Sequence, residues 1–155
     1  MTSGLVYVTD QDPGITRKRR GRGFSYTAPD GTTIAGWSDI PGAKGCTPQS
    51  CAFRDHHADL LAAGADRVYG LSVQSTPDQQ EAAERLHLPF ALLSDQDLKL
   101  QRALGLPLLQ AAGLTLLHRI TFIIKDGVIA HVFHSITDTA LNATDVLRRL
   151  EAQNK

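Results

Sequence analysis

From residue 47 onward, hydrophobic positions recur every three to four residues in some stretches and form short continuous runs in others. The first spacing is typical of amphipathic helices and the second of buried strands. The pattern predicts, in order, helix 47–63, strand 67–73, helix 75–88, strand 90–93, helix 95–104, strands 116–124 and 128–133, and a last helix opened by Asn142 or Thr144. With crossover helices early and a hairpin late, this order predicts an α/β chain with a mixed sheet covered by helices on both faces.

Capping residues mark the ends of several predicted helices. Gly64 and Gly105 stand where helices are expected to end, while Ser75 and Asp95 stand where helices are expected to begin. The order of elements is that of a thioredoxin-like fold.

The N-terminal segment, residues 1–36, is distinguished from the predicted domain, residues 37–155. Phe24–Thr27 and Thr32–Ile34 predict a small hairpin around the turn 28–31. A thioredoxin-like sheet needs a strand shortly before its first helix, and residues 24–27 are the best candidate. Because about eighteen residues then separate that strand from Cys46, a long connection for a compact domain, we expect atypical N-terminal strands.

Composition indicates one ordinary globular domain. The chain has 155 residues, of which 42% are hydrophobic and 21% charged. Its formal net charge of zero hides a basic run near the start, made of Arg17, Lys18, Arg19, Arg20 and Arg22. No apolar run is long enough for a membrane span, and residues 1–10 lack the features of a signal peptide, so we expect a cytoplasmic protein without a membrane partner.

Two cysteines, Cys46 and Cys51, stand at the start of the first predicted helix. Thr47 is a good N-cap residue and Pro48 suits the first helical position, which places Cys46 at the N-terminus of the helix. Backbone N–H groups and the positive end of the helix dipole stabilise a thiolate there. A disulfide between residues five apart would require the first turn to unwind. A reactive thiol with a conditionally reachable partner is the arrangement that a peroxide-reducing protein needs.

From about Trp37 to the C-terminus, the sequence resembles the peroxiredoxins of the bacterioferritin comigratory protein class. The motif that carries the resemblance is Cys46-Thr47-x-x-x-Cys51-x-x-Arg54-Asp55. It implies a thioredoxin-like fold and a thiol-dependent peroxidase for hydrogen peroxide or organic hydroperoxides, with no cofactor and no metal. Cys46 would attack the peroxide and become a sulfenic acid, and Cys51 would then form a disulfide with it. Thioredoxin or a similar dithiol would reduce that disulfide.

Arg119 matches, by the same resemblance, the peroxiredoxin arginine that faces the active site. A fixed guanidinium there would stabilise both the thiolate and the charge that develops on a peroxide oxygen. Arg54, in contrast, is expected to pair with Asp55 or with another carboxylate.

The loop before Cys46 departs from the family pattern. Peroxiredoxins usually have a threonine three residues before the reactive cysteine and a proline seven before it, but Ala43 and Asp39 stand at these positions. Pro41 and Thr47 supply those residue types at other offsets, and Thr47 is counted among the candidate site residues. Loss of one transition-state hydrogen bond typically costs roughly 100-fold in rate. The alternative is therefore a catalytically weak thioredoxin-fold interaction module, which could associate with DNA through the basic N-terminus.

A zinc site is a further alternative, built from Cys46, Cys51, His56 and His57. Adjacent histidines on one helix point in different directions, and the cysteine spacing fits no usual zinc motif. We therefore expect the two histidines to be a surface pair, with one of them partly packed.

Nucleic-acid binding through the basic run is the third class of function. Clustered guanidinium groups attract phosphate, and Phe24 and Tyr26 lie close by in the sequence. The first 34 or so residues are also similar to the start of bacterial type IB DNA topoisomerases, without any of their catalytic region. Because no recognition helix or stacking platform surrounds the run, nucleic-acid binding through it is the less favoured alternative, and a solvated basic segment is the favoured interpretation.

Overall fold

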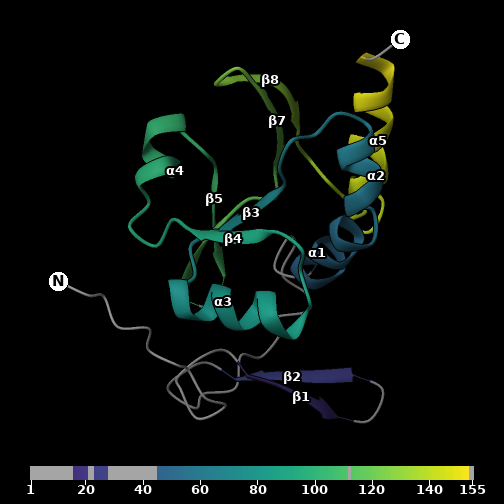
Figure 1. Ribbon diagram of the computed structural model, residues 1–155. Coiled ribbons are helices and arrows are strands. Elements are labelled where there is room, and N and C mark those ends of the chain that lie inside the picture. The colour runs from purple at the N-terminus through teal and green to yellow at the C-terminus, as the bar shows by residue number, and fades with distance from the viewer. Residues whose placement is uncertain (1–15, 21–22, 28–44, 112, 154–155) are drawn as a thin grey trace, which may run out of the picture.

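The computed structural model describes residues 16–20, 23–27, 45–111 and 113–153 (Figure 1). The helices are α1 (Cys46–Asp55), α2 (His57–Ala62), α3 (Thr76–Arg85), α4 (Lys99–Leu104) and α5 (Asn142–Gln153). The strands are β1 (Thr16–Arg20), β2 (Gly23–Thr27), β3 (Tyr69–Ser72), β4 (Ala91–Ser94), β5 (Leu108–Ala111), β6 (Leu114–Leu117), β7 (Thr121–Lys125) and β8 (Val128–Phe133). Helices and strands alternate through most of this order, as the hydrophobic pattern predicts.

The described strands pair in twos. β3 and β4 are parallel, whereas β1–β2, β5–β6 and β7–β8 are antiparallel. The predicted mixture of parallel and antiparallel pairing is therefore present, but no ladder joins the described pairs into one continuous sheet. On β3 and β4, Tyr69, Leu71 and Leu93 keep exposed side chains, so the described elements leave part of this pair uncovered.

Residues 17–20 of the basic run lie in a strand, which the sequence analysis did not predict. β1 pairs with β2 from Thr16 opposite Thr27 to Arg20 opposite Gly23. Only two residues separate the two strands, a spacing that favours a tight hairpin. The predicted pairing of Phe24–Thr27 with residues 32–34 falls on residues that the structure does not describe. Residues 28–34 and the loop positions before Gly45 lie outside the described residues.

The first predicted helix is divided into two. His56, at φ −99° and ψ 10°, interrupts the helix between α1 and α2, although its N–H still donates to Ala52 O at 3.0 Å. On the other side, Leu60 N–H donates to His56 O at 2.9 Å, so the two helices follow each other directly. Gly64, at φ 101°, ends the helical stretch as predicted.

The caps of the next helices agree with the sequence analysis at Ser75 and Gly105, whereas α4 begins at Lys99, after Leu98 at the N-cap position, and not at residue 95 as predicted. Ser75 Oγ accepts from Asp78 N–H at 3.3 Å and caps α3. The Asp95 carboxylate accepts from the N–H groups of Leu100 and Gln101, at 2.9 and 2.8 Å, at the start of α4. Gly105, at φ 62°, ends α4. These side chains satisfy N–H groups that the first helical turns leave unpaired.

The long strand predicted over residues 116–124 is wrong. β6 ends at Leu117 and β7 begins at Thr121, and each pairs with a different neighbour. β5 was not predicted; it pairs with β6, and Gly113, at φ 78°, lies in the connection between them. The predicted turn 125–127 is confirmed, with β7 and β8 on its two sides. Arg119 therefore lies in the segment that connects β6 to β7 and belongs to neither strand.

α5 packs against both α1 and α2. The hydrogen bond from Gln49 to Asn142 joins α5 to the first turns of α1. Figure 1 shows these three helices together on one side of the strands, with α3 against β4. Leu60 on α2 and Ala143 and Val146 on α5 are buried. Among the described residues, no helix is long and apolar enough to cross a membrane.

Candidate functional site

Cys46 is the first residue of α1, and its side chain is exposed. Gly45 precedes it at φ 110°, and Gly45 O accepts from Gln49 N–H at 3.0 Å. A Cβ added at Gly45 would lie 2.7 Å from Thr139 Cγ2, so both the backbone angle and the space require glycine there. The prediction that Thr47 caps the helix is wrong, because α1 begins one residue earlier and has no side-chain cap. Thr47 lies half-buried inside the first turn; that it takes part in catalysis stays a prediction.

Arg119 reaches Cys46 from the segment between β6 and β7. Its Nη1 and Nη2 atoms each lie 3.8 Å from Cys46 Sγ, although 73 residues separate the two in sequence. Both ends of the guanidinium therefore face one sulfur, at the end of a helix where backbone N–H groups are also unpaired. The positive charge of the guanidinium therefore lies directly against the sulfur. The structure thus brings together the two residues that the sequence analysis named for attack and electrostatic support.

Three residues that the sequence analysis missed hold this arrangement. Arg119 Nη1 donates to Gln49 Oε1 at 2.8 Å, and Gln49 Nε2 donates to Asn142 Oδ1 at 2.8 Å. Thr121 Oγ1 donates to the same Asn142 oxygen at 2.7 Å. Gln49 stands three residues after Cys46, so helical spacing could have placed it on the same face. No local signal points to Asn142 or Thr121.

Cys51 lies on α1, half-buried, and both thiols are free. Five residues along an ideal α-helix separate two Cα atoms by about 9 Å. Disulfide-bonded Cα atoms usually lie about 4.4–6.8 Å apart. The structure therefore keeps Cys46 and Cys51 apart for as long as the first turns of α1 are intact.

The hydrogen bonds of Arg54 connect elements of the fold and do not reach Cys46. It donates to Asp55 at 2.8 Å, as expected, and to Leu86 O at 2.9 Å, which ties α1 to the end of α3. The hydrogen bond to Asp55 raises the pKa of the Arg54 guanidinium above its ordinary value, although burial acts in the opposite direction.

The residues of the zinc alternative have other partners. His56 Nδ1 lies 3.4 Å from Asp59, and the ring of His57 stacks on Phe90 with centroids 6.0 Å apart. In the parts of the chain that the structure describes, no group of three or more His, Cys, Asp or Glu side chains could hold a metal ion.

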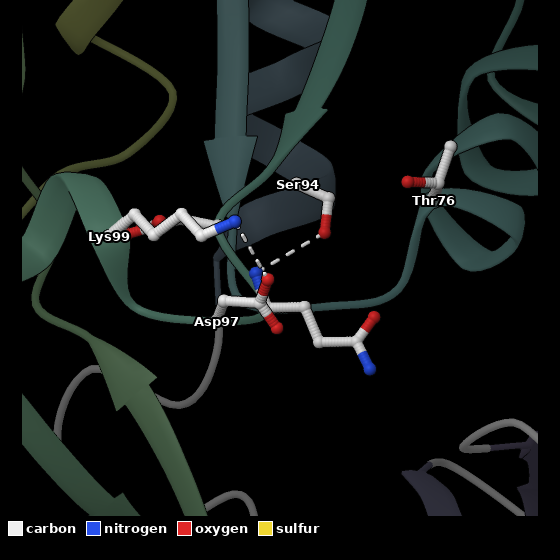
Figure 2. Close-up of a pocket in the computed structure, with 6 residues that line it drawn as sticks. Thr76, Ser94, Asp97 and Lys99 are labelled. Atoms are coloured by element: carbon white, nitrogen blue, oxygen red, sulfur yellow. Dashed lines mark hydrogen bonds and ion pairs between the residues drawn. The ribbon is translucent and has the colours of Figure 1, made fainter.

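A hollow with a volume of about 210 Å³ lies between the start of α3 and the segment that joins β4 to α4 (Figure 2). Its lining consists of Thr76, Ser94, Asp95, Gln96, Asp97 and Lys99. Lys99 Nζ pairs with Asp97 at 3.2 Å, and Ser94 Oγ accepts from Gln96 N–H. Neither Cys46 nor Arg119 lines this hollow, so it is separate from the thiol site.

Residues 31–147 match the protein family described as Redoxin. The chain belongs to the Redoxin family. This Redoxin-family chain is 35% identical to the chloroplastic peroxiredoxin Q of Sedum lineare over 109 residues, which cover 70% of the chain and 57% of that protein. It is 38% identical to the peroxiredoxin Bcp of Escherichia coli (strain K12) over 93 residues, covering 57% of the chain and 59% of that protein.

A solved structure of the bacterioferritin comigratory protein of Xanthomonas campestris shares the fold, with a TM-score of 0.61 and 26% identity. The superposition covers 72% of each chain. The resemblance to peroxiredoxins of this class and the thioredoxin-like fold are therefore confirmed. The Redoxin-family chain nevertheless spans less than two thirds of the length of the Sedum and Escherichia coli proteins. The similarity to topoisomerases, the division at residue 36 and the nucleic-acid partner stay predictions.

Proposed function

We propose that the chain is a thiol-dependent peroxidase and that Cys46 is the attacking thiol. The observation that carries this proposal is the Arg119 guanidinium beside an exposed sulfur at the start of a helix. Hydrogen peroxide and organic hydroperoxides are the proposed substrates. The Xanthomonas campestris relative has alkyl peroxide reduction activity, which supports the second class of substrate.

In the proposed first step, the Cys46 thiolate attacks one peroxide oxygen. An S–O bond forms while the O–O bond breaks, and the other oxygen leaves as water or an alcohol after taking a proton. The sulfur is oxidised to a sulfenic acid and the peroxide is reduced by two electrons. Negative charge moves from sulfur to the leaving oxygen, and the Arg119 N–H groups stabilise it at both places.

In the proposed second step, Cys51 resolves the sulfenic acid. Its sulfur attacks Cys46 Sγ, a disulfide forms and the hydroxyl leaves as water. Because the helix holds the two residues too far apart, the first turn of α1 must unwind before this step. An external dithiol of the thioredoxin type then reduces the disulfide back to two thiols. The cytoplasmic location stays a prediction, since the Sedum relative is a chloroplastic protein.

The test is intact-mass and thiol analysis of the reduced protein, Cys46→Ser and Cys51→Ser after one equivalent of hydrogen peroxide, repeated with cumene hydroperoxide. The parent should lose two thiols, Cys51→Ser should trap a sulfenic acid and Cys46→Ser should be inert. If the parent reacts no faster than free cysteine, the proposal is wrong.

A further inference from the structure

We propose that Asn142 is a positioning residue, which acts through Gln49 to fix the Arg119 guanidinium beside Cys46. The proposal deepens the peroxidase assignment and rests on it. Asn142 does not touch Cys46; its Oδ1 atom accepts from Gln49 Nε2, and Gln49 Oε1 accepts from Arg119 Nη1, both at 2.8 Å.

The chemistry of these groups fixes the direction of the relay. A guanidinium can only donate hydrogen bonds, so the Gln49 atom that faces Arg119 must be the amide oxygen. The amide nitrogen then points the other way and needs an acceptor. Asn142 Oδ1 supplies it, and the Thr121 hydroxyl, which donates to the same oxygen at 2.7 Å, helps to hold that oxygen in place. Without Asn142, the Gln49 amide can rotate and present donors to the guanidinium.

Asn142 is suited to this task by its burial. Its side chain is 1% exposed, and it opens α5, whose Ala143 and Val146 are also buried. The relay therefore connects a helix packed against α1 to a cation that lies at an exposed thiol. A fixed interior group limits the movement of this guanidinium. A misplacement of about 1 Å at a reacting centre can cost up to roughly 100-fold in rate.

The experiment uses the Cys51→Ser background, in which Cys46 is the single thiol. We would measure the rate of sulfenic acid formation with hydrogen peroxide and the rate of alkylation by iodoacetamide. The variants are Asn142→Ala and Asn142→Asp, each with Arg119 and with Arg119→Met. The matched control is Gln79→Ala, which removes another buried amide, 4% exposed, that donates to Leu93 O at 3.2 Å away from the site.

We expect Asn142→Ala to slow both reactions by about three- to tenfold when Arg119 is present, which is less than the loss expected on removing the guanidinium itself, and by less than about twofold in Arg119→Met. Asn142→Asp keeps an acceptor oxygen and should restore most of the rate, whereas Gln79→Ala should lower the melting temperature only. Equal losses in both Arg119 backgrounds, no loss at all, or an equal loss in Gln79→Ala would overturn the proposal. If Asn142→Ala does not fold, Thr121→Val tests the same link and should slow both reactions in the Arg119 background only.

The two readouts separate this proposal from the proposed function. A parent that does not react with peroxide refutes the peroxidase assignment. In that case the alkylation rates still decide whether Asn142 acts on Cys46 through Arg119.

Discussion

Replacing Arg119 by methionine should slow the reaction of Cys46 with hydrogen peroxide about 5- to 30-fold. Two nitrogen atoms lie 3.8 Å from the sulfur. At that distance a full charge interacts with an anion by about 1 kcal/mol in bulk water and by about 4 kcal/mol at an effective dielectric of 20. Because Cys46 is exposed, the lower part of this range applies, and about 1–2 kcal/mol corresponds to the stated factor.

The assay is stopped-flow measurement of the second-order rate constant for sulfenic acid formation in the Cys51→Ser background. Arg119→Lys should be intermediate, since one ammonium cannot face the sulfur as a planar fork does. The difference between parent and Arg119→Met should shrink in 1 M salt, where the screening length is about 3 Å. Arg85→Met is the matched control, because Arg85 is exposed and paired with Glu81 on α3. If Arg119→Met reacts as fast as the parent at low salt, the electrostatic reasoning is refuted.

The remaining predictions concern the structure around the site. Gly45→Ala should lower the free energy of unfolding by about 2 kcal/mol in urea titrations, because φ is 110° and the added Cβ would clash with the Thr139 side chain. Unchanged stability would contradict this. Burial alone would raise the pKa of Asp95, but N–H groups of α4 and the charge of Arg102 hold it below its ordinary value. Asp95 therefore stabilises the fold above about pH 4, the unfolded value, and this contribution is lost as the pH falls through the folded pKa. The melting temperature of the parent should fall more steeply below pH 4 than that of Asp95→Asn, and parallel curves would refute the assignment. In hydrogen exchange, the disulfide form should lose protection at the backbone N–H of Gln49, which donates to Gly45 O, and keep protection at the backbone N–H groups near the end of α1. Equal loss of protection along α1 would count against local unwinding.

Local chemistry explains what could be predicted of the site and what could not. The first helix was predicted because its apolar spacing is regular, and Gly64 marks its end. The exact first residue was missed because side-chain preference favours Thr47 as a cap, whereas the structure uses the positive φ of Gly45. Such a backbone conformation is not visible in a hydrophobic pattern.

Features that depend on distant partners were harder to predict. Residues 116–124 are apolar enough for one strand, yet β6 and β7 pair with different neighbours, and Arg119 lies in the break. Gln49 and Asn142 are 93 residues apart, so no periodicity can indicate that their amides meet. The Cys46 motif could be read from one helix, but the relay that holds Arg119 depends on how α5 packs against α1.

The two proposed steps make opposite demands on the first turn of α1. Attack on peroxide needs Cys46 held at the helix start, where Arg119 faces it, while disulfide formation needs Cys46 to leave that position. Gln49 lies between the two cysteines, and its side chain is fastened to buried Asn142. Further along, Arg54 ties α1 to Leu86 O. The part of α1 that can unwind at least cost is therefore the turn before Gln49, whose hydrogen bond to Gly45 O would break. Gln49 would then hold Arg119 in place throughout, so the cation stays ready when Cys46 returns as a reduced thiol.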